Sequence, residues 1–306
     1  RRLRTASPGE PPAPEAGGRP RAKPPVRALA RSLGIDLASV TPTGPHGDIT
    51  RADLERAQGA QRAETQPAAI AVASARLGEV IPVRGVRRAM ADAMVRSVQR
   101  APHVTEWVDV DVRRTVELVG RLRSDAVFAG VRVTPLTIAV SALVHAIRRT
   151  PIVNATWHDL PDGSAEIEVH RHVNVGIAVA SPRGLVVPHV PEADRLSLRD
   201  LAAAMTDITE RARSGALTPA DSVGGTITVT NVGVFGVDGG TPILNPGEAA
   251  ILAMGRFLER PWVVNGALAV RPVIELTLSF DHRIVDGAAG SAFLADVAAF
   301  LHDPPQ

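Results

Sequence analysis

Cysteine and tyrosine are both absent from this 306-residue sequence, and aromatic residues make up only 3% of it. The absence of cysteine excludes disulfides, thiolate metal sites and a cysteine nucleophile. If thiol chemistry takes place on this protein, the thiol therefore belongs to the substrate. Because base stacking needs aromatic side chains and few are present, we expect no nucleic-acid partner.

Lysine is almost absent as well, since Lys23 is the sole lysine and arginine supplies the other basic residues. The formal net charge is only +2, whereas the pI is about 10.1. The pI is high because no cysteine or tyrosine titrates between neutral and strongly alkaline pH, so it does not indicate a nucleic-acid surface. Neither a membrane-spanning apolar run nor a signal-peptide pattern is present, and we expect a cytoplasmic protein with no membrane attachment.

Changes in composition divide the chain into four segments. Residues 1–24, rich in Pro, Ala and Arg, and residues 59–77, rich in Ala and Gln, are predicted to be linkers. Residues 25–58 are predicted to form a small helical module between these linkers. Residues 78–306 remain for one large domain, and an apolar content of 45% is sufficient for its core.

The small segment, residues 25–58, predicts two short helices around a glycine-containing loop. The first helix has four apolar side chains on one face and ends at Gly34 (Val26, Leu29, Ala30 and Leu33). The second begins near Thr50, and Asp53 three residues later completes a capping box. So short a segment rarely forms a stable core alone, and a helical hairpin packed on the large domain is the simple alternative to a binding module. A linker on each side favours the module.

The large segment predicts strands and helices in uneven alternation. Thr134-Pro135 begins an apolar helix, and Ser197 with Asp200 begins another that ends at Gly215. An apolar stripe in residues 81–94 is expected to be core (Val86, Ala89, Met90, Ala93 and Met94). Strands are expected at 107–112, 173–180, 184–190, 225–230, 249–254 and 273–278, with a hairpin-like piece at 157–163. This pattern predicts an α/β domain with a mixed sheet, and it lacks the glycine fingerprint of a doubly wound nucleotide fold.

A histidine flanked by carboxylates follows the last predicted strand, in Asp281-His282-Arg283 and Asp286-Gly287, just before a short helix at about 292–301. Imidazole has an unperturbed pKa near neutrality, so it can take a proton from a thiol or hydroxyl and return it within one turnover. Taken alone, the pattern favours an ordinary surface or packed histidine over a catalytic base.

Two further polar patterns also have both an ordinary structural and a functional interpretation. Thr226, Thr228 and Thr230 share one face of a predicted strand, which β-propensity alone explains. Thr230, however, enters a glycine-rich loop, where its hydroxyl could stabilise an oxyanion. His170 and His172 lie two residues apart without a third ligand nearby, so we interpret them as surface histidines and predict no metal site.

Residues 25–58 contain several short motifs in a fixed order: Pro25-Val26-Arg27, Leu29-Ala30, Gly34-Ile35-Asp36-Leu37, Gly44, Gly47 and Ile49-Thr50-Arg51-Ala52-Asp53-Leu54. The segment resembles the peripheral subunit-binding domain of 2-oxo-acid dehydrogenase complexes. The resemblance implies two partners, the decarboxylating dehydrogenase and dihydrolipoamide dehydrogenase. Charge complementarity makes Arg27, Arg31 and Arg51 the candidates for partner contact, although they are also what a solvated helix surface carries. Asp48 occupies a position where that family usually has arginine.

The large segment carries motifs of its own: Gly176-Ile177-Ala178-Val179, Gly184-Leu185-Val186-Val187-Pro188, the threonine strand that ends at Thr230-Asn231, Asn245-Pro246 to Ile251, and Asp281-His282-Arg283 with Asp286-Gly287. Over residues 81–303 it resembles the catalytic domain of dihydrolipoyl acyltransferases, which form the core of 2-oxo-acid dehydrogenase complexes. The resemblance implies a chloramphenicol-acetyltransferase-like two-layer fold with a mixed sheet. It also implies homotrimers that build a larger core, with each active site between two subunits.

The same resemblance implies transfer of an acyl group from a dihydrolipoyl thioester to coenzyme A. His282 is then the general base that deprotonates the attacking thiol, Thr230 supplies the hydroxyl that stabilises the oxyanion, and Asp286 is the acidic residue that supports the site. A thiol-to-thioester exchange needs a base and an oxyanion donor, and neither a protein nucleophile nor a metal.

The lipoyl group has no attachment site in this sequence, because Lys23 lies in a predicted linker. We expect a lipoyl domain outside this chain to supply it, either on a longer protein of which this chain is the C-terminal part or in trans. The neighbourhood of 232–236 and the lack of an added cation favour acetyl or branched-chain acyl over succinyl. Two alternatives stay open: a non-catalytic core that binds partner enzymes, and a free-standing acetyltransferase of the chloramphenicol type, against which residues 25–58 argue.

Overall fold

The structure is a computed structural model that describes residues 20–64, 80–182 and 184–305. The chain divides into two compact units, Arg1–Ile81 and Pro82–Gln306, and each is described by itself. Most of the two predicted linkers lies outside the described residues.

The smaller unit contains two helices, α1 (Pro24–Leu33) and α2 (Arg51–Glu64), and a single 3₁₀ turn between them, Leu37–Ser39. α1 begins directly after Lys23, which is exposed and extended, because a proline at the first helical position needs no N–H partner. It ends at Gly34, whose φ of +67° suits a glycine cap. α2 runs to Glu64, beyond residue 58 where we expected the module to end. Five buried side chains form the core of the smaller unit (Ala30, Ile35, Val40, Ile49 and Leu54).

Asp53 is a buried carboxylate that joins two segments of the smaller unit through hydrogen bonds. Its Oδ2 accepts a hydrogen bond from the Thr50 N–H at 2.9 Å, and its own N–H donates to Thr50 Oγ1 at 3.4 Å, which confirms the predicted capping box. The carboxylate also accepts from Thr43, from Oγ1 at 2.6 Å and from N–H at 3.2 Å. These bonds hold the pKa of Asp53 well below its usual range, with the Thr43 hydroxyl contributing most.

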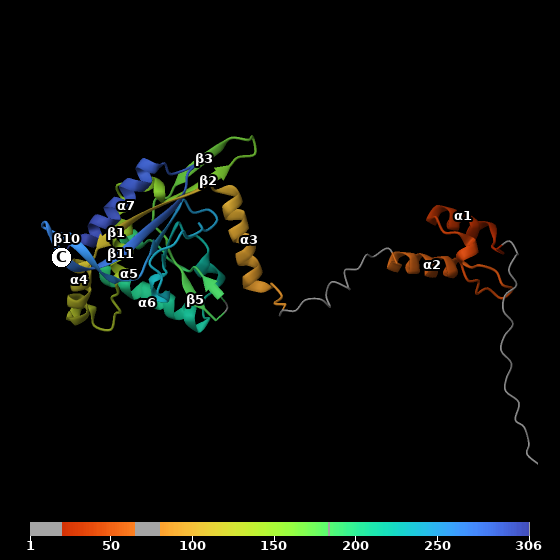
Figure 1. Ribbon diagram of the computed structural model, residues 1–306, viewed down its shortest axis with the longest axis horizontal. Helices are drawn as coiled ribbons and strands as arrows, with labels where there is room; N and C mark the ends of the chain where they lie inside the picture. The colour runs from red at the N-terminus through yellow and green to blue at the C-terminus, as the bar shows by residue number, and fades with distance from the viewer. Residues whose placement is uncertain (1–19, 65–79, 183, 306) are drawn as a thin grey trace, which may run out of the picture. The chain divides into compact units, whose positions relative to one another are not determined.

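The larger unit is built on a seven-stranded sheet of order β1-β11-β9-β8-β4-β7, with β10 paired to β11 (Figure 1). The strands are β1 (His103–Asp111), β4 (Val175–Ile177), β7 (His189–Val190), β8 (Ile227–Asn231), β9 (Ala250–Met254), β10 (Leu258–Val264) and β11 (Ala267–Asp281). β8 is parallel to both β4 and β9, and the other neighbours are antiparallel. The predicted mixed sheet is therefore confirmed.

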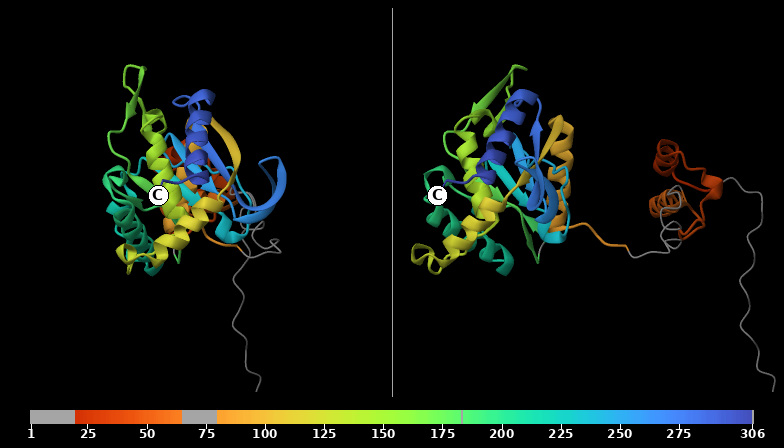
Figure 2. Two further views of the ribbon diagram at one scale, coloured as in Figure 1. Left: turned by 90° about the vertical axis from the view of Figure 1, so that its left-hand side faces the viewer. Right: turned by 60° about the vertical axis from the view of Figure 1, so that its left-hand side comes forward.

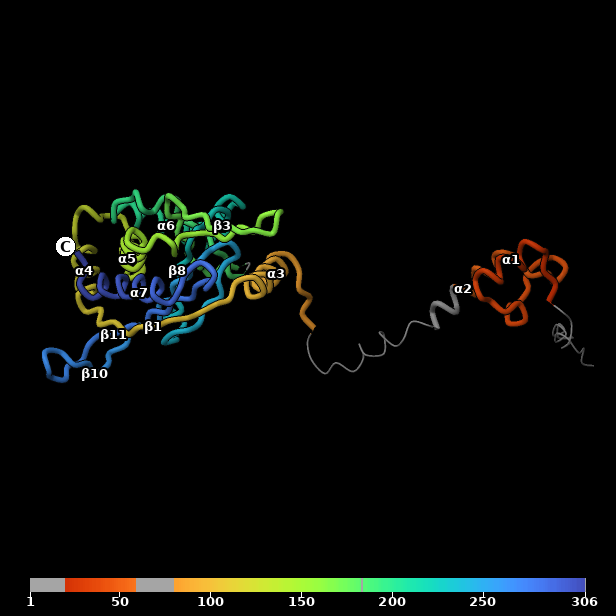
Figure 3. Tube along the Cα trace, turned by 90° about the horizontal axis from the view of Figure 1, so that it is seen from above, coloured from red at the N-terminus to blue at the C-terminus, as the bar shows by residue number. Residues whose placement is uncertain are grey.

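Helices cover one face of this sheet, which gives two layers. They are α4 (Arg113–Ser124), α5 (Pro135–Ile147), α6 (Leu198–Ser214) and α7 (Gly287–His302). α5 and α7 run side by side (Figure 2), and α5, α6 and α7 lie on the same side of β1 and β11 (Figure 3). α7 approaches β11 closely at Gly290, where a Cβ would lie only 2.6 Å from the Phe280 ring. A glycine is therefore required at this contact.

Two expectations about this unit were wrong in part. The apolar stripe of α3 (Gly85–Arg100) is not core, because Val86 and Met90 are 43% and 39% exposed. The stripe instead lines a cavity of about 440 Å³. The predicted strands 173–180 and 184–190 are each divided in two, since β5 (Val179–Ser181) and β6 (Gly184–Val186) leave the main sheet as a separate hairpin.

The hairpin expected at 157–163 is confirmed as β2 (Ala155–Asp159) and β3 (Ala165–Val169). Its β3 strand is exposed along its whole length. Across the described ranges, none of the helices is long and apolar enough to cross a membrane.

Candidate active site

His282 is the first residue after β11. The strand pairing continues into it, because its N–H donates to the Pro102 carbonyl at 2.9 Å. The backbone of His282 is therefore fixed against the residue that precedes β1, while its side chain is exposed in the single chain. The imidazole is thus held at the rigid end of a strand and is accessible from outside the chain.

The adjacent Asp281 is engaged by Arg283, not by the histidine. Arg283 donates to Asp281 from Nη2 at 2.7 Å and from Nε at 3.1 Å, and its backbone N–H donates to Oδ1 at 3.0 Å. The hydrogen bond to Asp281 raises the pKa of Arg283. The guanidinium also lies 4.6 Å from the ring centre of Trp157. These contacts fix the conformation of the loop that carries His282.

Asp286 lies four residues after His282 and caps α7. Its side chain accepts a hydrogen bond from the Ala289 N–H at 2.8 Å. A carboxylate is favourable here because it faces the positive end of the helix dipole. The cap also explains why α7 begins at Gly287 and not near residue 292, where the sequence placed the helix.

Thr230 is half-buried near the end of β8. Within the described part of the chain, its hydroxyl has no hydrogen-bond partner, although the neighbouring Thr228 is fully engaged. The next residue, Asn231, lines a cavity of about 350 Å³ together with Arg132, Arg213 and Phe257. An unpaired hydroxyl beside a cavity is available to a ligand.

The structure of one chain does not bring Thr230 and His282 together. Thr230 pairs with Ala253 of β9, and Ala253 pairs with Thr277 of β11. His282 lies five residues beyond Thr277, which is about 17 Å along a strand, and two strand spacings add about 10 Å across the sheet. The two residues are at opposite ends of the sheet, so one site that uses both needs two chains.

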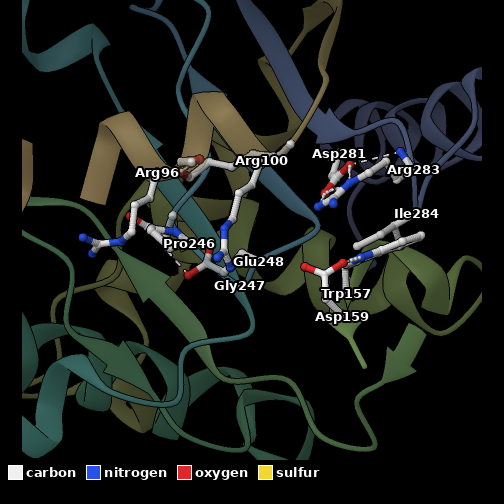
Figure 4. A pocket seen from close by; sticks show the side chains of 14 residues that line it. Arg96, Arg100, Trp157, Asp159, Pro246, Gly247, Glu248, Asp281, Arg283 and Ile284 are labelled. Atoms are coloured by element: carbon white, nitrogen blue, oxygen red, sulfur yellow. Dashed lines mark hydrogen bonds and ion pairs between the residues drawn. The ribbon is translucent and has the colours of Figure 1, made fainter. Parts of the chain in front are cut away.

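A cavity of about 160 Å³ lies against the His282 loop (Figure 4). Arg96 and Arg100 from the end of α3 lie on one side of it, and Asp281, Arg283 and Trp157 on the other. Among the described residues, neither Arg96 nor Arg100 forms an ion pair. These two guanidinium groups are therefore not in direct contact with an acidic side chain, although Asp159, Glu248 and Asp281 line the same cavity.

Glu248 lines the same cavity and was not selected from the sequence. Burial raises its pKa to about 7, although hydrogen bonds from Thr228 and Asn245 act in the opposite direction. The signal that could have identified it is a glutamate placed directly between a turn, Asn245-Pro246-Gly247, and an apolar strand.

The three arginines expected to contact partners are all exposed on the smaller unit. Arg27 donates from Nε to the Ala22 carbonyl at 3.0 Å, and Arg31 reaches back to the carbonyl of Arg27 at 3.4 Å. Arg51 forms an exposed ion pair with Glu55 at 3.0 Å. The first two guanidinium groups therefore keep their positive charge without an acidic partner among the described residues.

His170 and His172 do not converge on a common centre. His170 Nε2 lies 2.8 Å from Thr156 Oγ1, and His172 Nδ1 lies 3.3 Å from Asp194 Oδ2. Over residues 20–64, 80–182 and 184–305, no group of three or more His, Asp or Glu side chains is placed to hold a metal ion.

Comparison with known proteins decides the family. Residues 76–306 match the family of 2-oxoacid dehydrogenases acyltransferase, catalytic domain. The chain belongs to this acyltransferase family. Residues 20–55 of the acyltransferase match the E3 binding domain.

Curated relatives of this acyltransferase cover most of its length. It is 36% identical over 297 residues to the dihydrolipoyllysine-residue acetyltransferase component of the pyruvate dehydrogenase complex of Bacillus subtilis, covering 92% of this chain and 66% of that protein. The same component of Staphylococcus aureus is 34% identical over 303 residues, which is 93% of this chain and 70% of the relative. The acyltransferase thus spans about two thirds of the length of these relatives.

Solved structures share its fold. The probable dihydrolipoamide acetyltransferase of Listeria monocytogenes has a TM-score of 0.69 at 32% identity and covers 76% of this chain and 99% of that one. The dihydrolipoamide acetyltransferase of Azotobacter vinelandii has a TM-score of 0.70 at 31% identity, with 75% and 94% covered. The cubic core of a pyruvate dehydrogenase multienzyme complex has a TM-score of 0.67 at 31% identity, with the same coverage.

Proposed function

We propose that this acyltransferase moves an acetyl group from a dihydrolipoyl thioester to coenzyme A, as the core component of a pyruvate dehydrogenase complex. The observation that carries the proposal is His282, fixed at the end of β11 within a domain that matches the acyltransferase family along its whole length. The names of the curated relatives favour acetyl over the other acyl groups. The cytoplasmic location expected from the sequence remains part of this proposal.

His282 acts as the general base. Its imidazole takes the proton from the thiol of coenzyme A, and the thiolate attacks the carbonyl carbon of the thioester. The tetrahedral intermediate then collapses, the bond to the dihydrolipoyl sulfur breaks, and that sulfur takes the proton back from His282. One carbon–sulfur bond forms and one breaks, so no oxidant, metal or protein nucleophile takes part.

Thr230 stabilises the negative oxygen of the intermediate through its unpaired hydroxyl. In the Azotobacter vinelandii enzyme, a serine, a histidine and an asparagine were investigated for their role in catalysis. Thr230 and His282 are 52 residues apart, as that serine and histidine are, and Asp286 follows His282 by four residues, as that asparagine follows its histidine. The equal spacings support the assignment of all three residues.

Asp286 supports the site by fixing the start of α7. As the cap of that helix it defines where the His282 loop ends, so we assign it a positioning role and not a proton transfer.

The active site is shared between chains. Because Thr230 and His282 of one chain lie at opposite ends of the sheet, the Thr230 that serves a given His282 belongs to a neighbouring subunit. We therefore propose homotrimers that assemble into a larger core, a proposal that the similarity to a cubic core also supports.

Residues 25–58 recruit the partner enzymes. The E3 binding domain supports dihydrolipoamide dehydrogenase as one partner, and we propose the decarboxylating dehydrogenase as the other. Arg27, Arg31 and Arg51 present the positive charge that an acidic partner surface needs, whereas Asp48 reduces it. The lipoyl group comes from a domain outside this chain.

The test is steady-state transfer to coenzyme A from acetyl-, isobutyryl- and succinyl-dihydrolipoamide, with His282→Ala as the matched variant. We expect acetyl to be preferred, and turnover to fall about 10²- to 10⁴-fold in the variant while its assembly is unchanged. Turnover of no donor by an assembled protein would leave the non-catalytic core as the better interpretation.

A further inference from the structure

Glu248 is a buried acid that the proposed mechanism does not use. It lies in the segment between Leu244 and β9 and is 9% exposed. It lines the cavity beside the His282 loop (Figure 4). It also lines the cavity along α3. Carboxyl groups are rarely buried without a specific reason, because removal from water penalises the charged form.

A closed set of hydrogen bonds ties this acid to β8. Glu248 Oε1 accepts from the Thr228 hydroxyl at 3.0 Å and from Asn245 Nδ2 at 3.3 Å, and Asn245 Nδ2 also donates to Thr228 Oγ1 at 2.8 Å. Gly176 on the neighbouring β4 makes room for the set, since a Cβ there would lie 2.5 Å from Thr228 Oγ1. The position of Thr228 therefore depends on Glu248 and Asn245.

The same acid is connected through short contacts to both halves of the candidate active site. Thr228 precedes Thr230 by two residues, so their side chains share one face of β8. Ala249, directly after Glu248, accepts from the Asp281 N–H at 2.9 Å, and Asp281 directly precedes His282. A displacement of Glu248 would therefore shift Thr230 in one active site and His282 in another.

We infer that Glu248 is a positioning residue for the acyl transfer, which holds the Thr230 end of β8 against the segment that anchors Asp281 and His282. This inference rests on the proposed function. It assigns Glu248 no contact with substrate, only a contact with Thr228 and a chain connection to Ala249.

The acid form of Glu248 suits this role. Its Oε2 is buried and has no hydrogen-bond partner among the described residues. Burial raises the pKa of Glu248 to about 7. An unpaired negative charge there would be costly, whereas a neutral carboxyl keeps the two bonds on Oε1 without that penalty.

The charged groups that face Glu248 do not pair with it. Arg96 and Arg100 of α3, Asp159 of β2, and Asp281 with Arg283 line the same cavity. On the remaining side, Gly225 separates Glu248 from His189 of β7. In the described structure, no ion pair joins Glu248 to any of these groups, so none of them stabilises its charged form by direct contact.

Glu248→Gln tests this inference, because glutamine imitates the neutral acid in shape and in its donor and acceptor pattern. In the wild type, kcat/KM for coenzyme A should fall by about tenfold between pH 7 and 8.5 as Glu248 ionises. In Glu248→Gln this fall should disappear. The thiol of coenzyme A is common to both proteins, so its ionisation cancels in the comparison.

Two further variants complete the test. Thr228→Val removes the hydroxyl donor at nearly constant volume, and we expect kcat to fall about tenfold with little change in KM. Exposed Glu166→Gln on β3 is the control and should leave the pH profile as in the wild type. An unchanged fall at high pH in Glu248→Gln would overturn the inference while the proposed function stood. A wild type inactive at every pH would overturn both.

Discussion

Thr230 stands level with Thr277 of β11 across the sheet, and His282, the first residue after β11, lies five residues beyond Thr277. The two residues assigned to one reaction are therefore roughly 20 Å apart within a chain. The proposed reaction therefore pairs each residue with its counterpart from another subunit.

This separation predicts complementation between two inactive variants. In a trimer that mixes His282→Ala and Thr230→Val chains, one of the three interfaces combines an intact His282 with an intact Thr230. Co-expression of equal amounts should therefore restore about a quarter of the wild-type turnover, if the chains mix at random. The variants purified separately and then mixed without exchange are the control and should stay inactive. If co-expressed chains also stay inactive, the site lies within one chain.

Thr230 itself is tested by a matched pair of substitutions. Thr230→Val removes the hydroxyl and should lower kcat about 10²- to 10³-fold, because one oxyanion donor is lost. Thr230→Ser keeps the hydroxyl and should stay within about tenfold of the wild type. Equal losses in both variants would mean that the methyl group, not the hydroxyl, is what the site needs. Size-exclusion chromatography of each variant confirms that assembly is retained.

Asp53 makes the smaller unit sensitive to acid. Its pKa is lowered in the folded state, so its contribution to stability is complete above the ordinary carboxyl pKa of about 4 and is lost as pH falls below that value. Asp53→Asn should expose the Leu54 amide to hydrogen exchange at neutral pH, and the difference from the wild type should shrink towards about pH 2. Glu55→Gln, which loses only an exposed ion pair, is the control and should change little at any pH.

Gly290 predicts a steric effect of a single methyl group. Gly290→Ala would place a Cβ 2.6 Å from the Phe280 ring, so the free energy of unfolding should fall by about 1–3 kcal/mol. Because Phe280 lies two residues before His282, turnover should fall as well. Gly120→Ala, at an exposed position of α4, meets nothing within 4 Å, and it should raise the free energy of unfolding by about 0.5–1 kcal/mol. Chemical denaturation of the two variants measures both effects.

Glu248 should also change the pH dependence of stability. Its folded pKa of about 7 exceeds the unfolded value of about 4.3, so wild-type stability falls as pH rises between these values. Glu248→Gln removes this loss, and near pH 8 it should exceed the wild type in free energy of unfolding by about 4 kcal/mol. Near pH 4 the two proteins should be alike. A constant difference across this range would show that the carboxyl does not titrate within it.

The sequence predicted the starts and ends of helices well, because these depend on neighbouring residues. Ser197 caps α6 by accepting from the Asp200 N–H, and Gly215 ends that helix with a φ of +74°, both as predicted. Thr134-Pro135 likewise begins α5. Each of these features depends on residues within one or two turns of each other.

Features that depend on distant partners were not predictable in the same way. Thr43 donates to Asp53, ten residues along the sequence, and Thr228 donates to Glu248, twenty residues along. These pairs come together only when the chain has folded. The apolar stripe of α3 has the periodicity of a core helix, but what covers such a stripe is decided by other elements. The site residues His282, Thr230 and Asp286 came from motifs, and their placement in two half-sites needed the strand register.

Lys23, exposed and extended just before α1, has a practical consequence. As the sole lysine of this sequence, it offers the one side-chain amine for a fluorescent label. Because the sequence also lacks cysteine, one introduced thiol would take a second dye without cross-reaction. A donor on Lys23 and an acceptor on the larger unit would then measure, by energy transfer, the distance between the smaller unit and the catalytic domain.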